Sequence, residues 1–206
     1  MGFYGEHVLP RLIDRGCRAS GLDEWRSAAT GGLAGRVVEL GFGSGLNLAH
    51  YPAAVEEVLA VEPSGLAMRL AAPRISAAGP AVERVELGAI ETASCDGALS
   101  TFTLCTIGDV EATLAELRRA LKPGAGFHFL EHGLAPERRV ARWQRRLDPI
   151  QVRTAGGCHL TRDIPALVEA AGFEIERLEQ SYAKGPRPWT WFSTGIARNP
   201  TGPEGP

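Results

Sequence analysis

The chain has 206 residues, of which 44% are hydrophobic and 22% charged, and it contains 25 glycines and 14 prolines. The apolar content excludes a disordered chain, and the length predicts one domain, because a domain of this size buries roughly 70% of its extended surface. A formal net charge of -2 gives no global electrostatic reason to bind nucleic acid or an anionic membrane.

Helices and strands are predicted to alternate along the first two thirds of the chain. Residues 6–29 indicate one or two helices of mixed polarity. Short apolar and β-branched runs predict five strands, at 36–40, 55–61, 82–87, 98–107 and 127–130. Apolar spacing and breaker residues predict helices between them, at 46–51, 66–78 and 110–121. This alternation is typical of a parallel sheet with helices on both faces.

The last third has a different pattern. A helix is predicted over 138–148, with an apolar stripe at Val140, Trp143 and Leu147, and a second over 163–171. Two antiparallel strands, 173–183 and 190–198, flank a turn at 184–188. We therefore predict one domain over 1–198 and a disordered tail over 199–206, because the tail has no apolar residues to bury.

A glycine cluster follows the first predicted strand. The segment Glu39-Leu-Gly41-Phe42-Gly43-Ser-Gly45 lies between that strand and a predicted helix. Glycines allow tight turns and close approach of a ligand, and a helix start offers free N–H groups to an anion. The spacing is E-x-G-x-G-x-G, because Leu46 occupies the third glycine position of a dinucleotide fingerprint. It disfavours a nicotinamide oxidoreductase and is typical of an S-adenosylmethionine (SAM) loop.

A carboxylate ends the second predicted strand, at Glu62-Pro63. Neighbouring parallel strands end at the same edge of a sheet, so Glu62 is expected beside the glycine loop. A carboxylate there can accept hydrogen bonds from both hydroxyls of a ribose.

The four cysteines, Cys17, Cys95, Cys105 and Cys158, contain no Cys-X-X-Cys pair. The spacing favours neither a zinc site nor a disulfide framework, so we expect reduced thiols, no metal cofactor and a cytoplasmic protein. The N-terminus lacks the apolar region of a signal peptide, and no segment approaches the roughly 20 apolar residues of a membrane helix.

Several further segments resemble the class I SAM-dependent methyltransferases. The likeness is strongest to the methyltransferase type 11 family and its methyltransferase-like 7 thiol methyltransferases. It is carried by VVELGFGSGLNLAHYP, AVEPS, STFTLCTI, LRRALKPGAGFHFLEH, GGCHLTRDIPALVEAAGF and WFSTGIAR, which cover most of residues 36–198. The resemblance implies a Rossmann-like, mostly parallel seven-stranded sheet of order 3-2-1-4-5-7-6, with SAM as cofactor. It also implies a helical lid over 1–30, a SAM-binding half over 36–133 and a substrate-side half over 138–198.

The resemblance assigns cofactor-binding roles to particular residues. Glu62 holds the ribose and Pro63 lies near the adenine, while Thr101 lies beside the methionine end. The glycine loop contributes Glu39, Gly41, Phe42, Gly43 and Gly45. Ala89 and Ile90 correspond to an adenine-contacting backbone. Here the sequence departs from the family, because Ala89 replaces an acidic residue and about five residues are missing from 88–96.

The resemblance favours a small-molecule thiol as methyl acceptor. The alternatives are an oxygen, nitrogen or carbon acceptor on a quinone, lipid or natural product, or a SAM-binding regulator without turnover. His132 follows the fifth predicted strand, and His159 lies in the segment Gly157-Cys158-His159-Leu160. Both are candidate general bases, because histidine titrates near neutral pH. Tyr4 and His7 of the lid and Cys105 are the candidate substrate contacts.

An arginine-rich segment covers the helix predicted from residue 138. Five arginines surround the apolar stripe, at 138, 139, 142, 145 and 146. One hypothesis is a surface for a membrane lipid or nucleic acid. At this net charge the favoured interpretation is an amphipathic helix docked by its stripe, with at most weak peripheral membrane contact and no nucleic-acid partner. The oligomeric state is not predicted.

Overall fold

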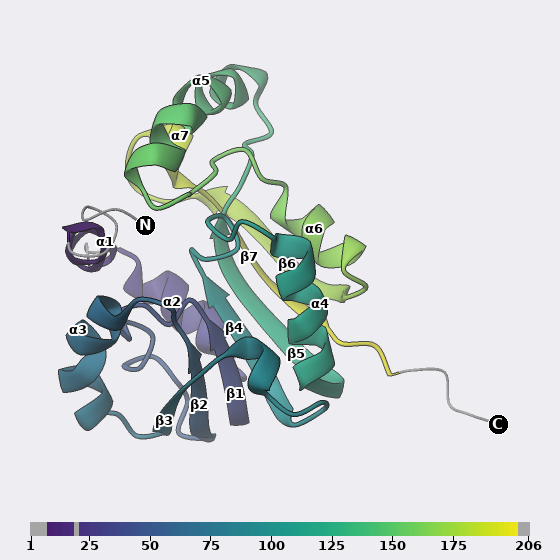
Figure 1. Cartoon of the computed structure of the whole chain (residues 1–206). Coiled ribbons are helices and arrows are strands. Elements are labelled where there is room, and N and C mark those ends of the chain that lie inside the picture. Colours follow the sequence, from purple (N-terminus) through teal and green to yellow (C-terminus); the bar gives the residue numbers. More distant parts are fainter. Residues whose placement is uncertain (1–7, 19–20, 202–206) are drawn as a thin grey trace.

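The computed structural model describes residues 8–18 and 21–201 (Figure 1). Its centre is a seven-stranded sheet of order β3-β2-β1-β4-β5-β7-β6, as predicted. Strands β1 to β5 are parallel, and β7 runs antiparallel to both β5 and β6. The strands are β1 Gly35–Leu40, β2 Val55–Val61, β3 Ala81–Val85, β4 Cys95–Thr101, β5 Leu121–His132, β6 Glu174–Tyr182 and β7 Trp191–Arg198.

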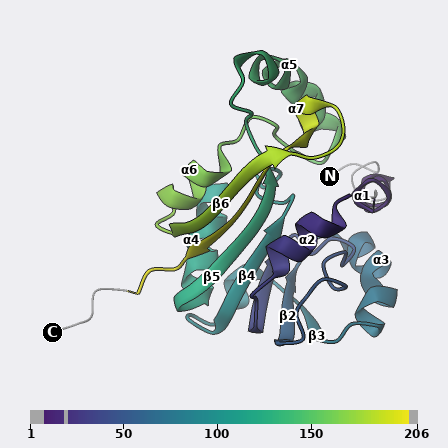
Figure 2. The same cartoon turned by 180° about the vertical axis from the view of Figure 1, so that it is seen from behind.

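Helices cover both faces of the sheet (Figures 1 and 2). They are α1 Leu9–Cys17, α2 Asp23–Thr30, α3 Gly65–Ser76, α4 Val110–Ala120, α5 Arg138–Thr154, α6 Ile164–Ala170 and α7 Arg187–Thr190, with a short 3-10 helix, η2, at Leu87–Ala89. Helices α4 and α6 pack on one face, and α2 and α3 pack on the other. Side-chain carboxylates of Asp109 and Asp163 cap the N-termini of α4 and α6, which satisfies backbone donors that a helix leaves free.

Strand β1 shows how the sheet divides the core. Val37 and Val38 are both fully buried, and they belong to opposite faces. Successive residues of a strand point to opposite faces, and a central parallel strand is covered on both. The apolar run therefore predicts β1 well, and it ends where the glycine loop begins.

The strand predicted over 98–107 ends earlier than its apolar sequence indicates. β4 stops at Thr101, and Phe102 has a φ of +53°. The next three N–H groups donate to the buried carboxylate of Glu131, at 2.9, 3.0 and 3.2 Å. These bonds replace a β-ladder and fold residues 102–107 into a compact loop.

Helix α5 is longer than predicted and docks by a different face. It continues through Pro149 to Thr154, and its buried residues are Ala141 and Gln144. Trp143 of the predicted stripe is 49% exposed, so the docking prediction is wrong on this point. Small and polar side chains dock α5, because Gln144 accepts a bond from Ala135 N and donates to Gly133 O. No helix within residues 8–18 and 21–201 is long and apolar enough to cross a membrane.

Asn199 contradicts the prediction that order ends at Arg198. Its side chain is 7% exposed, and its amide nitrogen donates to the carbonyls of Arg118, Leu121 and Lys122. Its backbone N–H donates to Ala125 O. The ordered structure therefore extends past β7, and residues 202–206 of the predicted tail lie outside the described part.

Candidate active site

A cavity of about 1030 Å³ lies at the carboxyl ends of β1, β2 and β4. Ligands of open parallel sheets bind at this edge. The glycine loop, the segment after β2 and the loop after β4 form its walls, and α1 and residues 155–156 close the other side. Its volume lies at the upper end of the roughly 300–1,000 Å³ common for small-molecule sites.

The glycine loop has the backbone that its composition predicts. Gly41, Gly43 and Gly45 have φ values of +65°, +57° and +73°. At Gly41 a Cβ atom would lie 2.0 Å from Thr103 Oγ1, so a side chain there collides with the loop after β4. Gly41 and Gly43 line the cavity, whereas Gly45 lies behind it against Phe42 and Leu48.

The helix predicted over 46–51 is absent. The segment forms successive turns instead, with Leu48 N donating to Gly45 O at 3.3 Å and His50 N to Asn47 O at 2.8 Å. Six residues before a proline make a poor helix, because isolated short helices are marginal and the residue before proline avoids helical angles. The expected helix dipole is therefore missing, and polar side chains surround the loop instead.

Glu62 is oriented by the glycine loop. Its Oε2 atom accepts a bond from Gly43 N at 2.8 Å, and its Oε1 atom accepts one from Ser64 N at 2.7 Å. Each carboxylate oxygen can accept about two bonds, so both keep capacity on the cavity side. The side chain lines the cavity and can receive a pair of hydroxyls.

A buried network lies under the loop and centres on Glu39. Glu39 is fully buried and accepts bonds from Asn47 Nδ2 and Tyr51 OH, both at 2.7 Å. Asn47 Nδ2 also donates to Thr101 Oγ1, and Arg26 Nη1 donates to Asn47 Oδ1. Burial raises the pKa of Glu39 to about 7, although these hydrogen bonds and the charge of Arg26 oppose the shift. Asn47 and Arg26 line the cavity and were not predicted from the sequence.

Helix α1 forms one wall of the cavity. Leu9, Ile13, Asp14 and Cys17 all line it. Asp14 accepts a bond from Ser44 Oγ at 2.6 Å and pairs with Arg74 at 3.1 Å. Burial alone would raise the pKa of Asp14, but the bond from Ser44 and the charge of Arg74 lower it overall. The helix is therefore fastened to the glycine loop itself.

The sequence of the chain is similar to those of known proteins. A family model described as "Methyltransferase domain" matches residues 38–149. The chain belongs to this methyltransferase-domain family. It is 31% identical over 172 residues to the thiol S-methyltransferase TMT1B of Rattus norvegicus, covering 77% of this chain and 66% of that protein. It is 30% identical over 167 residues to TMT1A of Homo sapiens, covering 74% and 65%. The chain thus spans just under two thirds of these relatives' length.

Solved structures share the fold of this methyltransferase domain at low identity. A SAM-dependent methyltransferase of Thermotoga maritima, described as a possible histamine N-methyltransferase, has a TM-score of 0.66 at 19% identity, covering 95% of this chain and 99% of that one. The [4+2]-cyclase SpnF has a TM-score of 0.65 at 16% identity, covering 88% and 80%. Since a cyclase shares the fold, the fold alone does not fix the reaction.

The structure places the other predicted cofactor contacts of the methyltransferase domain unequally. Pro63 and Thr101 line the cavity. Ala89 and Ile90 do not, and the Ile90 side chain is 5% exposed within the core. Leu87, at the start of η2, lines this side of the cavity instead. Where the sequence departs from the family, at 88–96, the residue that lines the cavity is therefore Leu87, two positions before the predicted Ala89.

The predicted bases, His132 and His159, and the predicted substrate contact Cys105 lie outside the cavity lining. His159 Nδ1 is 3.0 Å from Asp148 Oδ2, on the side of α5. His132 and the fully buried Cys105 lie behind Phe102 and Thr106, which do line the cavity. Tyr4 and His7 fall outside the described residues. Among residues 8–18 and 21–201, no histidine lines the cavity.

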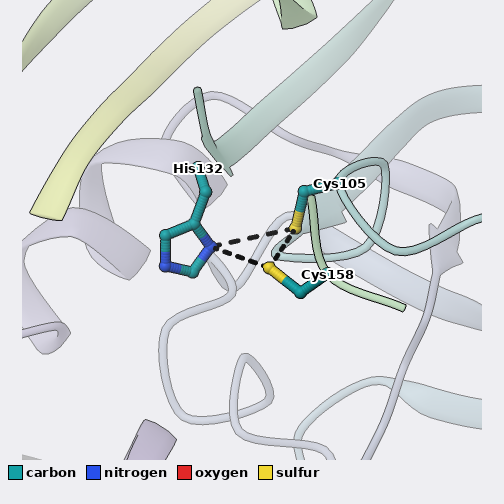
Figure 3. A group of neighbouring side chains, drawn as sticks. All are labelled: Cys105, His132 and Cys158. Carbon is teal, nitrogen blue, oxygen red and sulfur yellow. Dashed lines mark hydrogen bonds between the residues drawn. The ribbon is translucent and has the colours of Figure 1, made fainter. Parts of the chain in front are cut away.

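Two cysteines and a histidine meet beside the cavity, despite the absence of a Cys-X-X-Cys pair (Figure 3). Cys105 Sγ and Cys158 Sγ are 3.6 Å apart, and His132 Nδ1 is 3.8 and 3.9 Å from them. The neighbouring Cys105 and His132 lower the pKa of Cys158, and the contact with Cys158 together with burial raises that of Cys105. The cysteine spacing gave no sign of this cluster.

A second hollow, of about 680 Å³, lies between α5 and the β6–β7 edge. Its lining includes Arg138, Arg142 and Arg145 of α5, together with Arg162. The glycine loop and Glu62 do not line it. The first cavity is therefore the candidate active site.

Proposed function

We propose that this methyltransferase-domain protein transfers a methyl group from SAM to a small-molecule thiol. The observation that carries the proposal is the cavity formed by the glycine loop and Glu62. The family match and the thiol S-methyltransferase relatives support the reaction and the acceptor class.

The residues of the cavity fit SAM. Gly41 and Gly43 expose backbone without side chains, as close approach of the methionine part requires. Glu62 would accept the ribose hydroxyls, and Pro63 and Leu87 would flank the adenine. Asn47 and Thr101 present polar atoms where the methionine end would lie.

When bound, SAM supplies an electrophilic methyl group on a sulfonium. The chain then has to hold the acceptor in line and exclude water. No histidine among the described residues lines the cavity, and the lowered pKa of Asp14 makes its carboxylate a weaker base than an ordinary aspartate. This lining favours a thiol, because a thiol with a pKa of about 8.5 ionises without a strong base whereas an alcohol does not.

Binding and turnover test the proposal separately. We expect isothermal titration to give one SAM site with a dissociation constant of about 10–100 µM or lower. We expect release of S-adenosylhomocysteine with thiols from a panel of thiols, phenols and amines. Without a protein base, the rate with each thiol should rise with pH and level off near that thiol's own pKa.

Each other outcome has a distinct meaning. Absence of SAM binding would overturn the proposal. Binding without turnover for any acceptor would indicate a regulator, and turnover with phenols or amines alone would reject the thiol. A plateau at one pH for thiols of different pKa would indicate a protein base.

Glu62→Gln should weaken SAM binding. The amide keeps the size of the side chain but loses the charge, and its nitrogen cannot accept the bond from Gly43 N or Ser64 N. Hydrogen bonds to charged groups are worth about 1.5–3 kcal/mol, so the dissociation constant should rise roughly 10–100-fold in the titration. Glu83→Gln, an exposed carboxylate of β3, is the matched control. Equal affinity in both variants would show that Glu62 does not hold the cofactor.

Two expectations about the protein's surroundings stay predictions. A cytoplasmic location follows from the cysteine usage alone. Weak peripheral contact of α5 with an anionic membrane is supported by the exposed Trp143, whose ring lies 5.5 Å from the guanidinium of Arg146.

A further inference from the structure

The cluster of Cys105, His132 and Cys158 joins three separate segments (Figure 3). Cys105 lies in the loop after β4, His132 ends β5, and Cys158 follows α5. Figure 3 shows both sulfur atoms and the imidazole Nδ1 pointing toward one shared centre. The three atoms all lie within 4.8 Å of one another.

The spacing of these atoms matches three corners of a tetrahedral zinc site. Zinc–sulfur bonds of about 2.3 Å and zinc–nitrogen bonds of about 2.05 Å give tetrahedral edges of about 3.8 Å between sulfurs and about 3.6 Å between sulfur and nitrogen. The observed edges are 3.6 Å for the two sulfurs and 3.8 and 3.9 Å to the nitrogen. We propose that Cys105, His132 and Cys158 bind a zinc ion that fastens the wall of the methyl-transfer cavity.

Backbone contacts hold the two cysteine segments together without a metal. His159 N donates to Cys105 O at 2.8 Å. Gly157 has a φ of +93°, and a Cβ atom there would lie 3.0 Å from Thr106 O. This close approach requires glycine next to Cys158. The ligand positions are therefore set by the fold and do not depend on flexible side chains.

The surroundings also restrain two of the ligands, His132 and Cys105. The His132 ring packs against the rings of Phe102 and Phe192, with centroid distances of 4.9 and 5.1 Å, and those two rings also contact each other at 5.1 Å. The backbone N–H of Cys105 donates to the buried carboxylate of Glu131 at 3.2 Å. Outer partners of this kind orient ligands and tune a metal site.

The donor set selects the metal. Two thiolates and one imidazole are soft to borderline ligands, which favour zinc over magnesium or calcium. Three protein ligands leave the fourth position to water or an added ligand. Three residues of the cavity lining lie next to the ligands: Phe102 packs against His132, Thr106 follows Cys105 and Gly156 lies two residues before Cys158. The ion would therefore stabilise this side of the cavity from behind.

Metal titration tests the site without any methyl acceptor, so its result is separate from that of the proposed function. Protein freed of metal under reducing conditions should bind one zinc or cobalt ion per chain. Cobalt should show the visible bands of a tetrahedral site and sulfur-to-cobalt charge-transfer absorption. In Cys105→Ser or Cys158→Ser, metal affinity should fall by more than the roughly 10–100-fold that loss of an outer-shell partner costs. Cys95→Ser, a buried cysteine outside the cluster, should retain it.

A second measurement needs no variant. Zinc should slow alkylation of Cys105 and Cys158, followed by peptide mass spectrometry, and leave Cys17 and Cys95 unaffected. Unchanged labelling of the pair, or cobalt bound without charge-transfer absorption, would overturn the site. The site would also be overturned if the isolated protein held a Cys105–Cys158 disulfide and still bound no metal after that disulfide was reduced. The two cysteines would then be a thiol pair and not metal ligands.

Discussion

Gly41→Ala should abolish measurable SAM binding and lower the free energy of unfolding by about 2–5 kcal/mol. The left-handed backbone costs a residue with Cβ about 1–2 kcal/mol, and an overpacked contact costs about 1–3 kcal/mol more. The new methyl group would lie 2.0 Å from Thr103 Oγ1 and 2.7 Å from Thr103 Cβ. Rotating the threonine side chain does not remove the second contact, so the loop after β4 or the glycine loop must move. Titration with SAM and urea denaturation measure the two effects.

Gly43→Ala is the matched control. Gly43 has a similar φ of +57°, but the nearest atom to a Cβ there is Gly41 O at 3.7 Å. This variant carries the backbone strain without the collision, so it should lose only about 1–2 kcal/mol. Equal losses in the two variants would show that the contact with Thr103 is unimportant.

Glu39 should contribute stability that is lost as pH rises from about 4.5 to about 7, and Glu39→Gln should remove this contribution to the pH dependence. The buried Glu39 has its pKa raised to about 7 from 4.5, so the folded state keeps a proton that the unfolded state has released. Unfolding then releases a proton in this interval, and raising the pH favours the unfolded chain. The shift corresponds to about 3 kcal/mol, present below pH 4.5 and lost above pH 7.

Denaturant midpoints at several pH values measure this effect as a difference between wild type and variant. Glutamine can mimic the protonated acid, because the Tyr51 hydroxyl can reverse and accept from the new amide. The variant should therefore be the more stable protein at pH 8 by about 3 kcal/mol. Glu131→Gln is a contrast, because Glu131 accepts from three backbone N–H groups and an amide nitrogen cannot. The Glu131→Gln variant should be less stable than the wild type at every pH. Parallel curves for wild type and Glu39→Gln would show that the Glu39 pKa is not raised.

The strand order was predictable from the family resemblance, and the alternation of helices and strands from local patterns. The local predictions were wrong where a hydrogen bond to a residue distant in sequence decided the conformation or the packing. Residues 102–107 are apolar enough for a strand, yet Glu131, more than twenty residues later, accepts hydrogen bonds from the backbone N–H groups of 103–105. Likewise, Trp143 fits a helical stripe, but the docking contacts of Gln144 turn another face of α5 inward.

The candidate site was predictable where one short segment carries it. The glycine loop and Glu62 line the cavity, since strand ends and their order place them there. Asn47 was hidden inside a predicted helix, and Arg26 lies in a segment with no motif. His132 was proposed because it follows a strand, but strand ends also bear side chains that point behind the cavity wall, as that of His132 does.

The hydrogen bonds that Asn199 donates show that one helix end depends on a much later part of the chain. Helix α4 leaves carbonyl groups without intrahelical partners at its C-terminus, as every helix does. Asn199 lies 81 residues after Arg118 and 78 after Leu121, and its side chain supplies those partners. During synthesis on the ribosome, the carbonyl groups in the last turn of α4 therefore lack these hydrogen bonds until β7 has paired and Asn199 is in place. This contact can form only after β7 and Asn199 have been synthesised.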